Sequence, residues 1–587
     1  MKKYRGILVL TWFLLFALLT GCGGAAETDF VSDTDIETDT EAGLVTETEA
    51  APIRETEAEA ESESETERET ETETEPETET ELETELETDP EQPLVEPAVL
   101  WEENGAVLRL YNEASGARAV LYKAPDAGFL GDAYAVELSL DGETWYPLDV
   151  WTARVAVQIA SNVYDLYTTN FVNFDVEGQA FLRVTPCADG AVKIRPEGWV
   201  RSAAAGDATV IRITEACQLS LEVGGDLYRN LQIFANPIEA VDKTDPDIIY
   251  LEAGLYTAEN CDLITCSVST NNGVEVYTPV LHVPAGKTLY LSGGAVVQAM
   301  IHFDTVEDAA VRGRGVVDHY PWNRANNIRA SEPKPSPAGI RVENSKNITV
   351  EGVIVRNSQA YSIYAGNTAG LTVDNFKCIS AAQWSDGFDA MATSDVVIKN
   401  SFFRTNDDCI AIYGSRWNNK GDSRNYEIYD CILWADNAHA INMGNHGSND
   451  ASNSDIIENI YFHDIEILEV HSINWTGAFS VMCGGENILR NVTLERFNVE
   501  FTKSDLIRLR FTMDAEHYGF SLENFTFRDI YFIPREGQKA GVYLEGLNKW
   551  RLIKGVTFEN VYVGNEKLTA RSSAFHKNEY VTNFTFR

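Results

Sequence analysis

The second half of the chain repeats a short pattern of hydrophobic and polar positions. Each copy is a run in which hydrophobic and polar residues alternate, a turn that often holds Asn or Asp, and a second such run. Clear copies begin at residues 347, 371, 396, 426, 460, 492, 525 and 556. Alternation with a period of two is typical of β-strands with one buried face. Helical spacing is missing between the copies, so the pattern predicts strands joined by turns.

A strand–turn–strand unit of this size cannot bury its hydrophobic face alone, so it must stack on neighbouring copies. The copies recur at steps of roughly 22 to 34 residues and lack the Leu-x-x-Leu-x-Leu frame and the helix of leucine-rich repeats. We therefore predict an all-β protein with a right-handed parallel β-helix over residues 237–587. Residues 581–587 still alternate as a strand and are expected to close the stack.

Residues 96–236 carry a different pattern. Short period-two runs, such as 106–111, 135–140 and 210–214, are separated by Gly, Asp and Asn. Runs at this spacing are typical of an antiparallel β domain, and we predict a β-sandwich. The region contains no candidate catalytic group, so we expect it to cap the helix or to bind sugar.

The first 22 residues have the parts of a secretory signal in order: a basic start, an apolar run over about residues 7–19, and small residues before Cys22. The apolar run is too short to span a bilayer comfortably. The end of the segment resembles a bacterial lipobox. That resemblance implies a lipoprotein signal peptide over residues 1–22, a diacylglyceryl anchor on Cys22, and a place on the bacterial cell surface, with membrane contact through the lipid only. An ordinary signal peptide cleaved elsewhere is the alternative.

A strongly acidic segment follows, and we interpret residues 23–95 as a tether. Residues 27–91 hold 28 acidic side chains and two arginines in a near-repeat of Glu-Thr, a formal charge of −26. Such a segment cannot bury a core and is expected to be disordered and extended. The remaining body, residues 92–587, still carries −22 of the total of −45. A body this acidic argues against nucleic acid as a ligand.

The cysteines predict no zinc site, because none of the nine falls in a Cys-x-x-Cys spacing. Cys378, Cys409 and Cys431 lie in strand-like runs and are expected to be small buried hydrophobes. We predict no metal and no cofactor, and we expect a monomer.

Three aspartates stand out against the repeat. Asp386 lies in the segment 384–389, and Asp407 and Asp408 lie in 406–414, after an interval of 21 and 22 residues, about one coil. Equivalent positions on successive coils are about 4.7–4.9 Å apart. Like charges this close raise one another's pKa, so one acid should hold a proton near neutral pH. Glycosidic cleavage needs such an acid beside a carboxylate.

Two other interpretations of the aspartates remain open. Asp and Asn cap the turns of most β-helix coils, so the three residues can be purely structural. The same oxygens can also form a calcium site.

The two segments resemble the Asn-Thr-Asp-Gly and Gly-Asp-Asp-Cys motifs of glycoside hydrolase family 28, the polygalacturonases, and the related aspartates of family 49, the dextranases. Residues 290–297 and 311–318 resemble the opening coils of both families, and the similarity covers about residues 230–510. It implies a pectin-lyase-like β-helix. A β-sandwich before the helix is more like family 49 and a set of bacterial family 28 relatives.

The resemblance also implies roles for individual residues. Asp407 is the general acid, and Asp386 and Asp408 hold the attacking water, so that the anomeric centre is inverted. His439, within Ala438-His439-Ala440, takes the place of the family's Gly-His-Gly and orients the acid. His446 is a competing candidate for that histidine.

Arg508 and Arg510 are the nearest match to the family's Arg-Ile-Lys, and the resemblance implies that they hold the sugar beside the cleaved bond. Trp384 and Ser385 depart from the family pattern, which has Asn and Thr at these positions. Asp389 fits no role in it.

Aromatic and basic residues near the aspartates suggest how a sugar is held. Trp384 and Trp417 are our candidates for stacking on sugar rings. Arg404, Arg416 and Lys420 offer positive charge that a uronate would need.

These observations predict an inverting polysaccharide hydrolase. A pectic galacturonan is the favoured substrate, although the acidic body and the missing lysine favour a neutral α-glucan such as dextran. A glycan-binding surface protein without catalysis and a calcium-dependent pectate lyase are the alternatives.

Overall fold

The computed structural model describes residues 98–160, 163–271, 274–319, 337–472, 477–535, 538 and 540–587. The predicted signal peptide, Cys22 and the acidic tether lie outside these residues. The described chain consists of strands and two short 3-10 helices, η1 (Glu103–Gly105) and η2 (Ala127–Phe129), which confirms the all-β prediction. Within the described ranges, no helix is long and apolar enough to cross a membrane.

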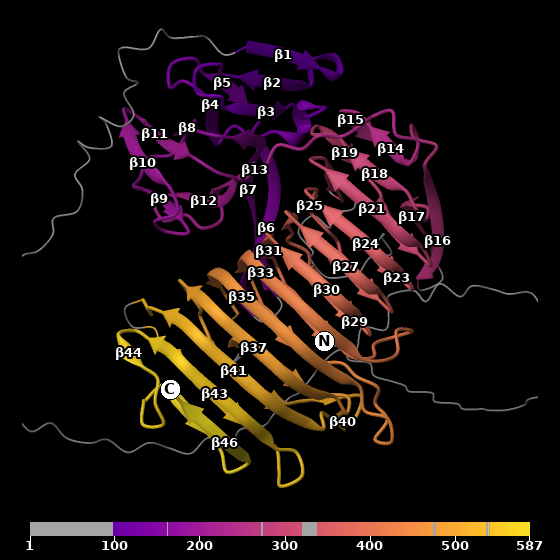
Figure 1. Cartoon of the computed structure of the whole chain (residues 1–587), viewed down its shortest axis with the longest axis vertical. Helices are drawn as coiled ribbons and strands as arrows, with labels where there is room; N and C mark the ends of the chain where they lie inside the picture. Colours follow the sequence, from indigo (N-terminus) through magenta and orange to yellow (C-terminus); the bar gives the residue numbers. More distant parts are fainter. Residues whose placement is uncertain are drawn as a thin grey trace, which may run out of the picture.

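From Ile248 to the carboxyl end the chain winds into coils, and the strands of these coils form two sheets (Figure 1). The larger sheet contains β14 (Ile248–Leu251), β15 (Gly254–Tyr256), β18 (Thr288–Leu291), β19 (Ala295–Val297), β21 (Glu307–Gly313), β22 (Val316–Asp318), β24 (Lys346–Glu351), β25 (Ile354–Arg356), β27 (Ala369–Asp374), β28 (Lys377–Ile379), β30 (Ser394–Lys399), β31 (Phe402–Thr405), β33 (Ser423–Ala435), β35 (Ile456–Val470), β37 (Ile488–Val499), β41 (Ser521–Phe532), β43 (Ile553–Val563), β44 (Glu566–Lys567) and β46 (Val581–Phe586).

The smaller sheet contains β16 (Ile264–Asn271), β17 (Val274–His282), β20 (Met300–Asp304), β23 (Ile340–Glu343), β26 (Ile363–Gly366), β29 (Phe388–Met391), β32 (Ile410–Tyr413), β34 (Ile441–Met443), β36 (Gly477–Cys483), β38 (Asp505–Phe511), β42 (Val542–Glu545) and β45 (Phe575–Lys577). A small hairpin, β39 (Met513–Asp514) and β40 (His517–Tyr518), lies outside both sheets.

Strands of successive coils pair in parallel, and this confirms the predicted parallel β-helix. Leu371 of β27, for example, pairs with Val396 of β30, which pairs with Tyr426 of β33. Antiparallel pairs occur only where β16 meets β17 and where β43 meets β44 among the described strands of these two sheets. A coil therefore adds one strand to the smaller sheet and one or two strands to the larger sheet.

The recurring Asn and Asp residues of the sequence form the corners of the coils. Asn375, Asn400, Asp430 and Asp464 occupy equivalent positions with φ between 50° and 55°, the left-handed region that these two residue types tolerate best after glycine. Earlier coils place Gly352 at the same corner, with φ 79°. The polar turn of each repeat is thus a conformational requirement.

A second column of corners is joined by side-chain amides. Asn459 donates to Asn425 at 3.1 Å, Asn491 donates to Asn459 at 3.3 Å, and Asn524 donates to Asn491 at 3.2 Å. Asn459 and Asn491 each both donate and accept, so the column forms a continuous ladder along the stack.

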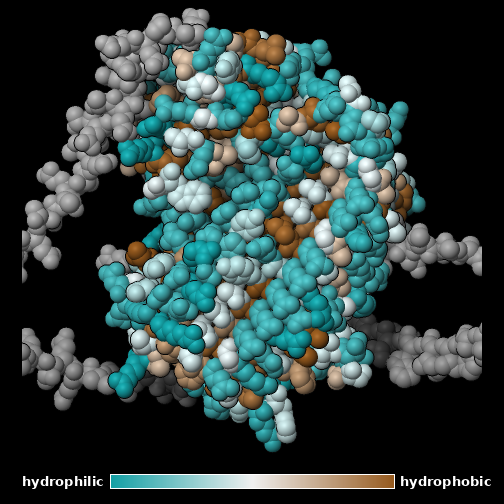
Figure 2. Space-filling view, in the orientation of Figure 1, coloured by the Kyte–Doolittle hydropathy of each residue, from teal (hydrophilic) through white to brown (hydrophobic). Residues whose placement is uncertain are grey.

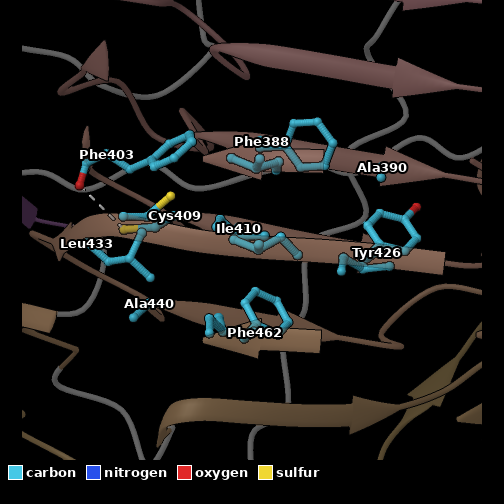
Figure 3. Packing of buried hydrophobic residues seen from close by; sticks show 14 of the residues in the cluster. Phe388, Ala390, Phe403, Cys409, Ile410, Tyr426, Leu433, Ala440 and Phe462 are labelled. Carbon is cyan, nitrogen blue, oxygen red and sulfur yellow. Dashed lines mark hydrogen bonds between the residues drawn. The ribbon is translucent and has the colours of Figure 1, made fainter. Parts of the chain in front are cut away.

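Hydrophobic side chains fill the space between the sheets (Figure 3). Phe388 and Ile410 of the smaller sheet meet Tyr426 and Phe462 of the larger one, and all four are at most 2% exposed. Cys378, Cys409 and Cys431 are free and buried, as predicted. The core lies directly beneath the turns that carry the aspartates, so these turns rest on a close-packed support.

The outer face of the larger sheet carries charges that alternate from coil to coil. Arg424, Glu458, Arg490, Glu523 and Lys554 are register partners on successive strands, and each contact within the column joins opposite charges. Hydrophilic residues accordingly dominate this view of the surface (Figure 2).

Two further sheets precede the helix. One contains β1 (Ala98–Glu102), β2 (Val107–Tyr111), β3 (Arg118–Tyr122), β7 (Val163–Glu177), β13 (Leu231–Asn236), β12 (Cys217–Val223) and β9 (Val192–Arg195), with β6 (Trp151–Ala160) beside β7. The other contains β10 (Arg201–Ala205), β11 (Ala208–Ile213), β8 (Ala180–Pro186), β4 (Tyr134–Ser139) and β5 (Tyr146–Leu148).

The two sheets share one hydrophobic cluster, in which Leu219 and Val172 of the first meet Leu182 and Ile211 of the second. The prediction of a purely antiparallel arrangement is wrong at one pair, because β13 runs parallel to β7. In the sheet, β13 lies between β7 and β12, parallel to the first and antiparallel to the second.

The N-terminal sheets pack on one flank of the helix through hydrophobic and charged contacts. Phe234 and Phe402 belong to one cluster that spans both parts. Arg404 is fully buried there, where it pairs with Asp436 at 3.0 Å and donates to Asn230 at 2.8 Å. The expectation that Arg404 offers charge to a sugar is therefore wrong, because its side chain turns away from solvent into this interface.

Prediction for the amide ladder. Asn459→Ala removes two ladder contacts and places a residue with a Cβ but no capping amide at a φ of 58°. We expect a loss of about 1–3 kcal/mol in the free energy of unfolding, measured by urea titration of the full chain. Asn459→Gly is the matched control, since it loses the same contacts but tolerates the conformation, and it should cost less. Equal losses for the two variants would contradict a conformational role.

Candidate active site

The turns that precede β29, β32 and β34 stack on one another and carry the predicted acids. Gly387 N donates to the Asp408 carbonyl at 2.8 Å, and Cys409 N donates to the His439 carbonyl at 2.9 Å. The strand-to-strand bonding thus continues into the turns. Carboxylate oxygens of Asp386, Asp407 and Asp408 lie within 4.8 Å of one another. The proximity predicted from the one-coil interval is confirmed.

A fourth carboxyl group belongs to this cluster. Asp389 is fully buried on β29, and neither of its oxygens has a hydrogen-bond partner among the described residues. Arg416 Nη1 lies 3.6 Å from Asp389 Oδ2. Sequence reasoning gave Asp389 no role. The available signal was the alternation of β29, in which Phe388 faces the core and the next residue faces outward.

Burial and mutual repulsion raise the pKa values of these acids. Burial raises the pKa of Asp407 to about 7, and the charge of Asp408 adds to the rise. Burial also raises the pKa of Asp389 to about 8, although Arg416 works in the opposite direction. The pKa of Asp386 is well above its usual range because of burial and then the charges of Asp389, Asp407 and Asp408. Protons are therefore available in the cluster at neutral pH.

Asp408 is held by three donors. His439 Nδ1 lies 2.6 Å from Asp408 Oδ1, the His439 backbone N donates to the same oxygen at 3.0 Å, and Asn442 Nδ2 donates to Oδ2 at 2.8 Å. Donors of this kind stabilise an ionised carboxylate. The contact requires the hydrogen on Nδ1, and His439 Nε2 is left without a described partner.

The second histidine lies elsewhere. His446 Nδ1 is 3.5 Å from Asp514 Oδ2, and its ring meets Tyr413 edge-on at 5.0 Å. Between the two candidates, only His439 contacts a carboxylate of the cluster within the described structure.

The two arginines lie on β38, two strands along the smaller sheet from β34. Asn442, Ser480 and Arg508 are register partners on β34, β36 and β38, so the Cα atoms of Arg508 and Asn442 are about 10 Å apart along the stack. Arg508 pairs with Asp505 at 2.9 Å and with Glu545 at 3.1 Å. Arg510 contacts Met482 Sδ at 3.2 Å.

The two tryptophans border the cluster on different sides. Trp384 adopts a φ of 61° and is partly buried, and its backbone lowers the pKa of Asp407. Trp417 is 37% exposed and stacks on Tyr364 with ring centroids 6.1 Å apart and planes 17° apart. A long hairpin of β6 and β7 also reaches this region, where the Asn437 amide donates to the Tyr164 hydroxyl at 3.2 Å.

The donors around Asp408 also weigh on the calcium alternative. Asp386, Asp407 and Asp408 form a group of oxygens that could hold a metal ion. Calcium takes 6–8 oxygen ligands, most of them ionised or carbonyl oxygens. Here three nitrogen donors already contact the two oxygens of Asp408, so these oxygens are engaged by hydrogen bonds. The arrangement is better suited to moving a proton than to holding a hard cation.

Comparison with known proteins agrees with this geometry. Residues 282–474, about a third of the chain, match Glycosyl hydrolases family 28. The probable endo-xylogalacturonan hydrolase A of Aspergillus fumigatus is 25% identical over 228 residues, which cover 37% of this chain and 52% of that protein. Exopolygalacturonase B of Aspergillus niger is 24% identical over 178 residues, 29% of this chain and 38% of that protein. The chain spans about half the length of the curated relatives it matches.

Among solved structures, Dex49A from Penicillium minioluteum aligns with a TM-score of 0.51 at 12% identity, covering 80% of this chain and 98% of that one. The likeness extends over most of the chain and shows a shared fold. The matched segment contains Asp386, Asp407, Asp408 and His439, so the resemblance to family 28 predicted from the motifs is confirmed for residues 282–474.

Prediction for the buried acids. An unfolded aspartate titrates near pH 4, whereas the folded pKa of Asp389 is about 8. Below pH 4 both states hold the proton. Between these values only the folded state keeps it, so the folded state loses up to about 1.4 kcal/mol of stability for each pH unit. Asp389→Asn removes this loss. Its stability relative to the parent should therefore rise between pH 5 and pH 8, measured by urea unfolding.

The control for this prediction is Asp165→Asn, at an exposed position of the β6–β7 hairpin. It should leave the pH dependence unchanged. A stability difference between Asp389→Asn and the parent that is the same at pH 5 and pH 8 would contradict the raised pKa.

Proposed function

We propose that the protein is a glycoside hydrolase that cleaves a pectic, galacturonan-type polysaccharide by inversion. The observation that carries the proposal is the meeting of three carboxyl groups from two successive coils within 4.8 Å. One of them, Asp408, contacts His439 and Asn442, and another, Asp407, has a pKa of about 7. The family match over residues 282–474 supports the same chemistry.

Asp407 is the general acid in this proposal. With a pKa near 7, its carboxyl group is protonated for much of the time at neutral pH and can transfer that proton to the leaving glycosidic oxygen. Asp408 is the base, because His439 and Asn442 stabilise its ionised form. Asp386 completes the site for the attacking water beside Asp408.

The spacing of the acids makes the stereochemistry a point to test. Inverting enzymes commonly hold their two carboxyl groups roughly 6.5–9.5 Å apart, and retaining enzymes about 5–5.5 Å. The closest oxygens here lie within 4.8 Å. Inversion is therefore supported by the family resemblance, and the anomer released by the first turnover, followed by proton NMR, decides between the two outcomes.

The relatives support a pectic substrate, because their names specify xylogalacturonan and polygalacturonate. We also propose that the enzyme works on the bacterial surface, held by a lipid on Cys22 through the acidic tether. A polysaccharide is its expected partner, and the lipid is its only expected contact with the membrane.

Prediction for the acids. Asp407→Asn should lower the rate of reducing-sugar release from polygalacturonate by at least about 10³-fold while substrate still binds, because the amide cannot donate the catalytic proton. Rhamnogalacturonan and dextran serve as comparison substrates. The control is Asp430→Asn, which makes the same change of side chain at a corner of the larger sheet and should keep activity. Undiminished hydrolysis by both Asp386→Asn and Asp407→Asn would refute the mechanism.

The assay also separates the alternatives. Glycan binding without hydrolysis by the parent would favour a surface adhesin. An unsaturated product that disappears with a chelator would favour a lyase. Faster hydrolysis of dextran than of polygalacturonate would favour the neutral glucan.

Prediction for the anchor. Cys22→Ser should abolish labelling by a radioactive or alkyne-bearing fatty acid and release the protein from the membrane fraction, because the thiol is the acylated group. Cys187→Ser, which removes an exposed cysteine of the N-terminal sheets, is the control. Labelling that survives in Cys22→Ser would contradict a lipid at this position.

A further inference from the structure

Arg416 occupies an unusual place beside the acid cluster. Its guanidinium carbon lies 4.0 Å from the centroid of the Trp417 ring, 5.4 Å from that of Tyr413 and 5.9 Å from that of Tyr361. The nearest carboxylate is Asp389, at 3.6 Å. The side chain is 20% exposed, so solvent reaches this charge beside the three aromatic rings.

The guanidinium has no hydrogen-bonded counter-ion. A separation of 3.6 Å exceeds hydrogen-bonding distance, and no side-chain nitrogen of Arg416 is hydrogen-bonded to a described residue. Burial keeps the pKa of Asp389 near 8, so this neighbour is largely neutral at pH 7. Buried arginines usually form two parallel bonds to a carboxylate. Among the described residues, this guanidinium therefore has no hydrogen-bonded carboxylate.

The loop that carries Arg416 is held rigidly. Arg416 and Asn419 exchange two backbone hydrogen bonds of 3.0 Å, which close a tight turn over Trp417. The Asn419 amide donates to the Tyr364 hydroxyl, and Gly421 N donates to Ser415 Oγ at 3.0 Å. Trp417 keeps a φ of 50° within this turn. A strained and tightly bonded loop costs little further entropy when a ligand binds.

The other basic candidates are less suited to a ligand carboxylate. Arg508 already has two carboxylate partners and lies about 10 Å from Asn442. Arg404 is buried against the N-terminal sheets. Arg416 is beside the acids and accessible.

We propose that Arg416 binds the carboxylate of a uronic acid unit in the sugar site next to the acid cluster, with the exposed Trp417 ring against that unit. This inference rests on the proposed function. It makes Arg416 the residue that selects acidic over neutral polysaccharides. The carboxylate of the substrate would balance the positive charge of the Arg416 guanidinium, to which Asp389 is not hydrogen-bonded.

The test compares two ligands in the full chain made inactive by Asp407→Asn. Calorimetric titration measures the binding of trigalacturonate and of its carboxyl-reduced, neutral counterpart. Arg416→Gln should weaken the binding of trigalacturonate by about 10- to 100-fold, the range expected for charge-assisted hydrogen bonds, and should leave binding of the neutral trisaccharide unchanged. Lys399→Gln, which removes a cation of β30 that pairs with Asp374 at 3.3 Å, should affect neither ligand.

A second variant keeps the test informative if Arg416→Gln fails to fold. Arg416→Lys retains the charge but loses the planar fork, so it should bind trigalacturonate more weakly than the parent and the neutral sugar equally well. Equal loss for both ligands in either folded variant, or no loss for either ligand, overturns the inference. If the parent with Asp407 intact releases no sugar from polygalacturonate, the proposed function fails. If it does and Arg416 variants keep their selectivity, only the role of Arg416 fails.

Discussion

Backbone hydrogen bonds between parallel strands tie each coil to the next, and the distance that they impose governs the candidate site. The bonds continue past the strands into the turns of Asp386, Asp408 and His439. Because neighbouring coils are about 4.8 Å apart, groups from three coils meet in a space of the size of one sugar ring. Burial and the mutual repulsion of carboxylates at that distance raise the pKa of Asp407 to about 7. The acid strength at the site is therefore a consequence of burial first and of the neighbouring charge second.

The same spacing explains why part of the site was predictable from the sequence. A one-coil interval converts directly into neighbouring positions in space, so Asp386 and the pair at 407–408 could be brought together without any structure. The Asn and Asp turns were likewise visible, since left-handed corners restrict the residue types allowed there. Residues whose importance depends on what covers them could not be ranked. Asp389 matters because the loop after β32, on the next coil, brings Arg416 close to it. The hydrophobic repeat does not predict that contact.

The sequence also did not predict toward which face of the coil each polar side chain points. Arg404 and Arg416 are close in sequence to the same aspartates, yet one faces the N-terminal sheets and the other faces the acids. His439 precedes β34 and His446 follows it, and of the two only His439 contacts Asp408 in the described structure. A coil crosses two sheets within a few tens of residues, so few residues separate opposite faces and an error of three or four positions changes the environment completely. The hydrophobic period locates strands, but it does not say which polar loop overhangs which face.

The N-terminal sheets are joined to the helix by charges that have no contact with solvent. Arg195 of β9 is fully buried and contacts Glu469 of β35 at 2.7 Å, 274 residues later in the chain. Glu222 of β12 contacts the same guanidinium at 2.8 Å, so the N-terminal sheets supply one carboxylate themselves and the helix supplies the others, Glu469 and Glu500. Both of these glutamates follow the turns of Asp386, Asp408 and His439 in the chain. Only a chain that already contains the candidate site can therefore surround this buried charge with its full set of carboxylates.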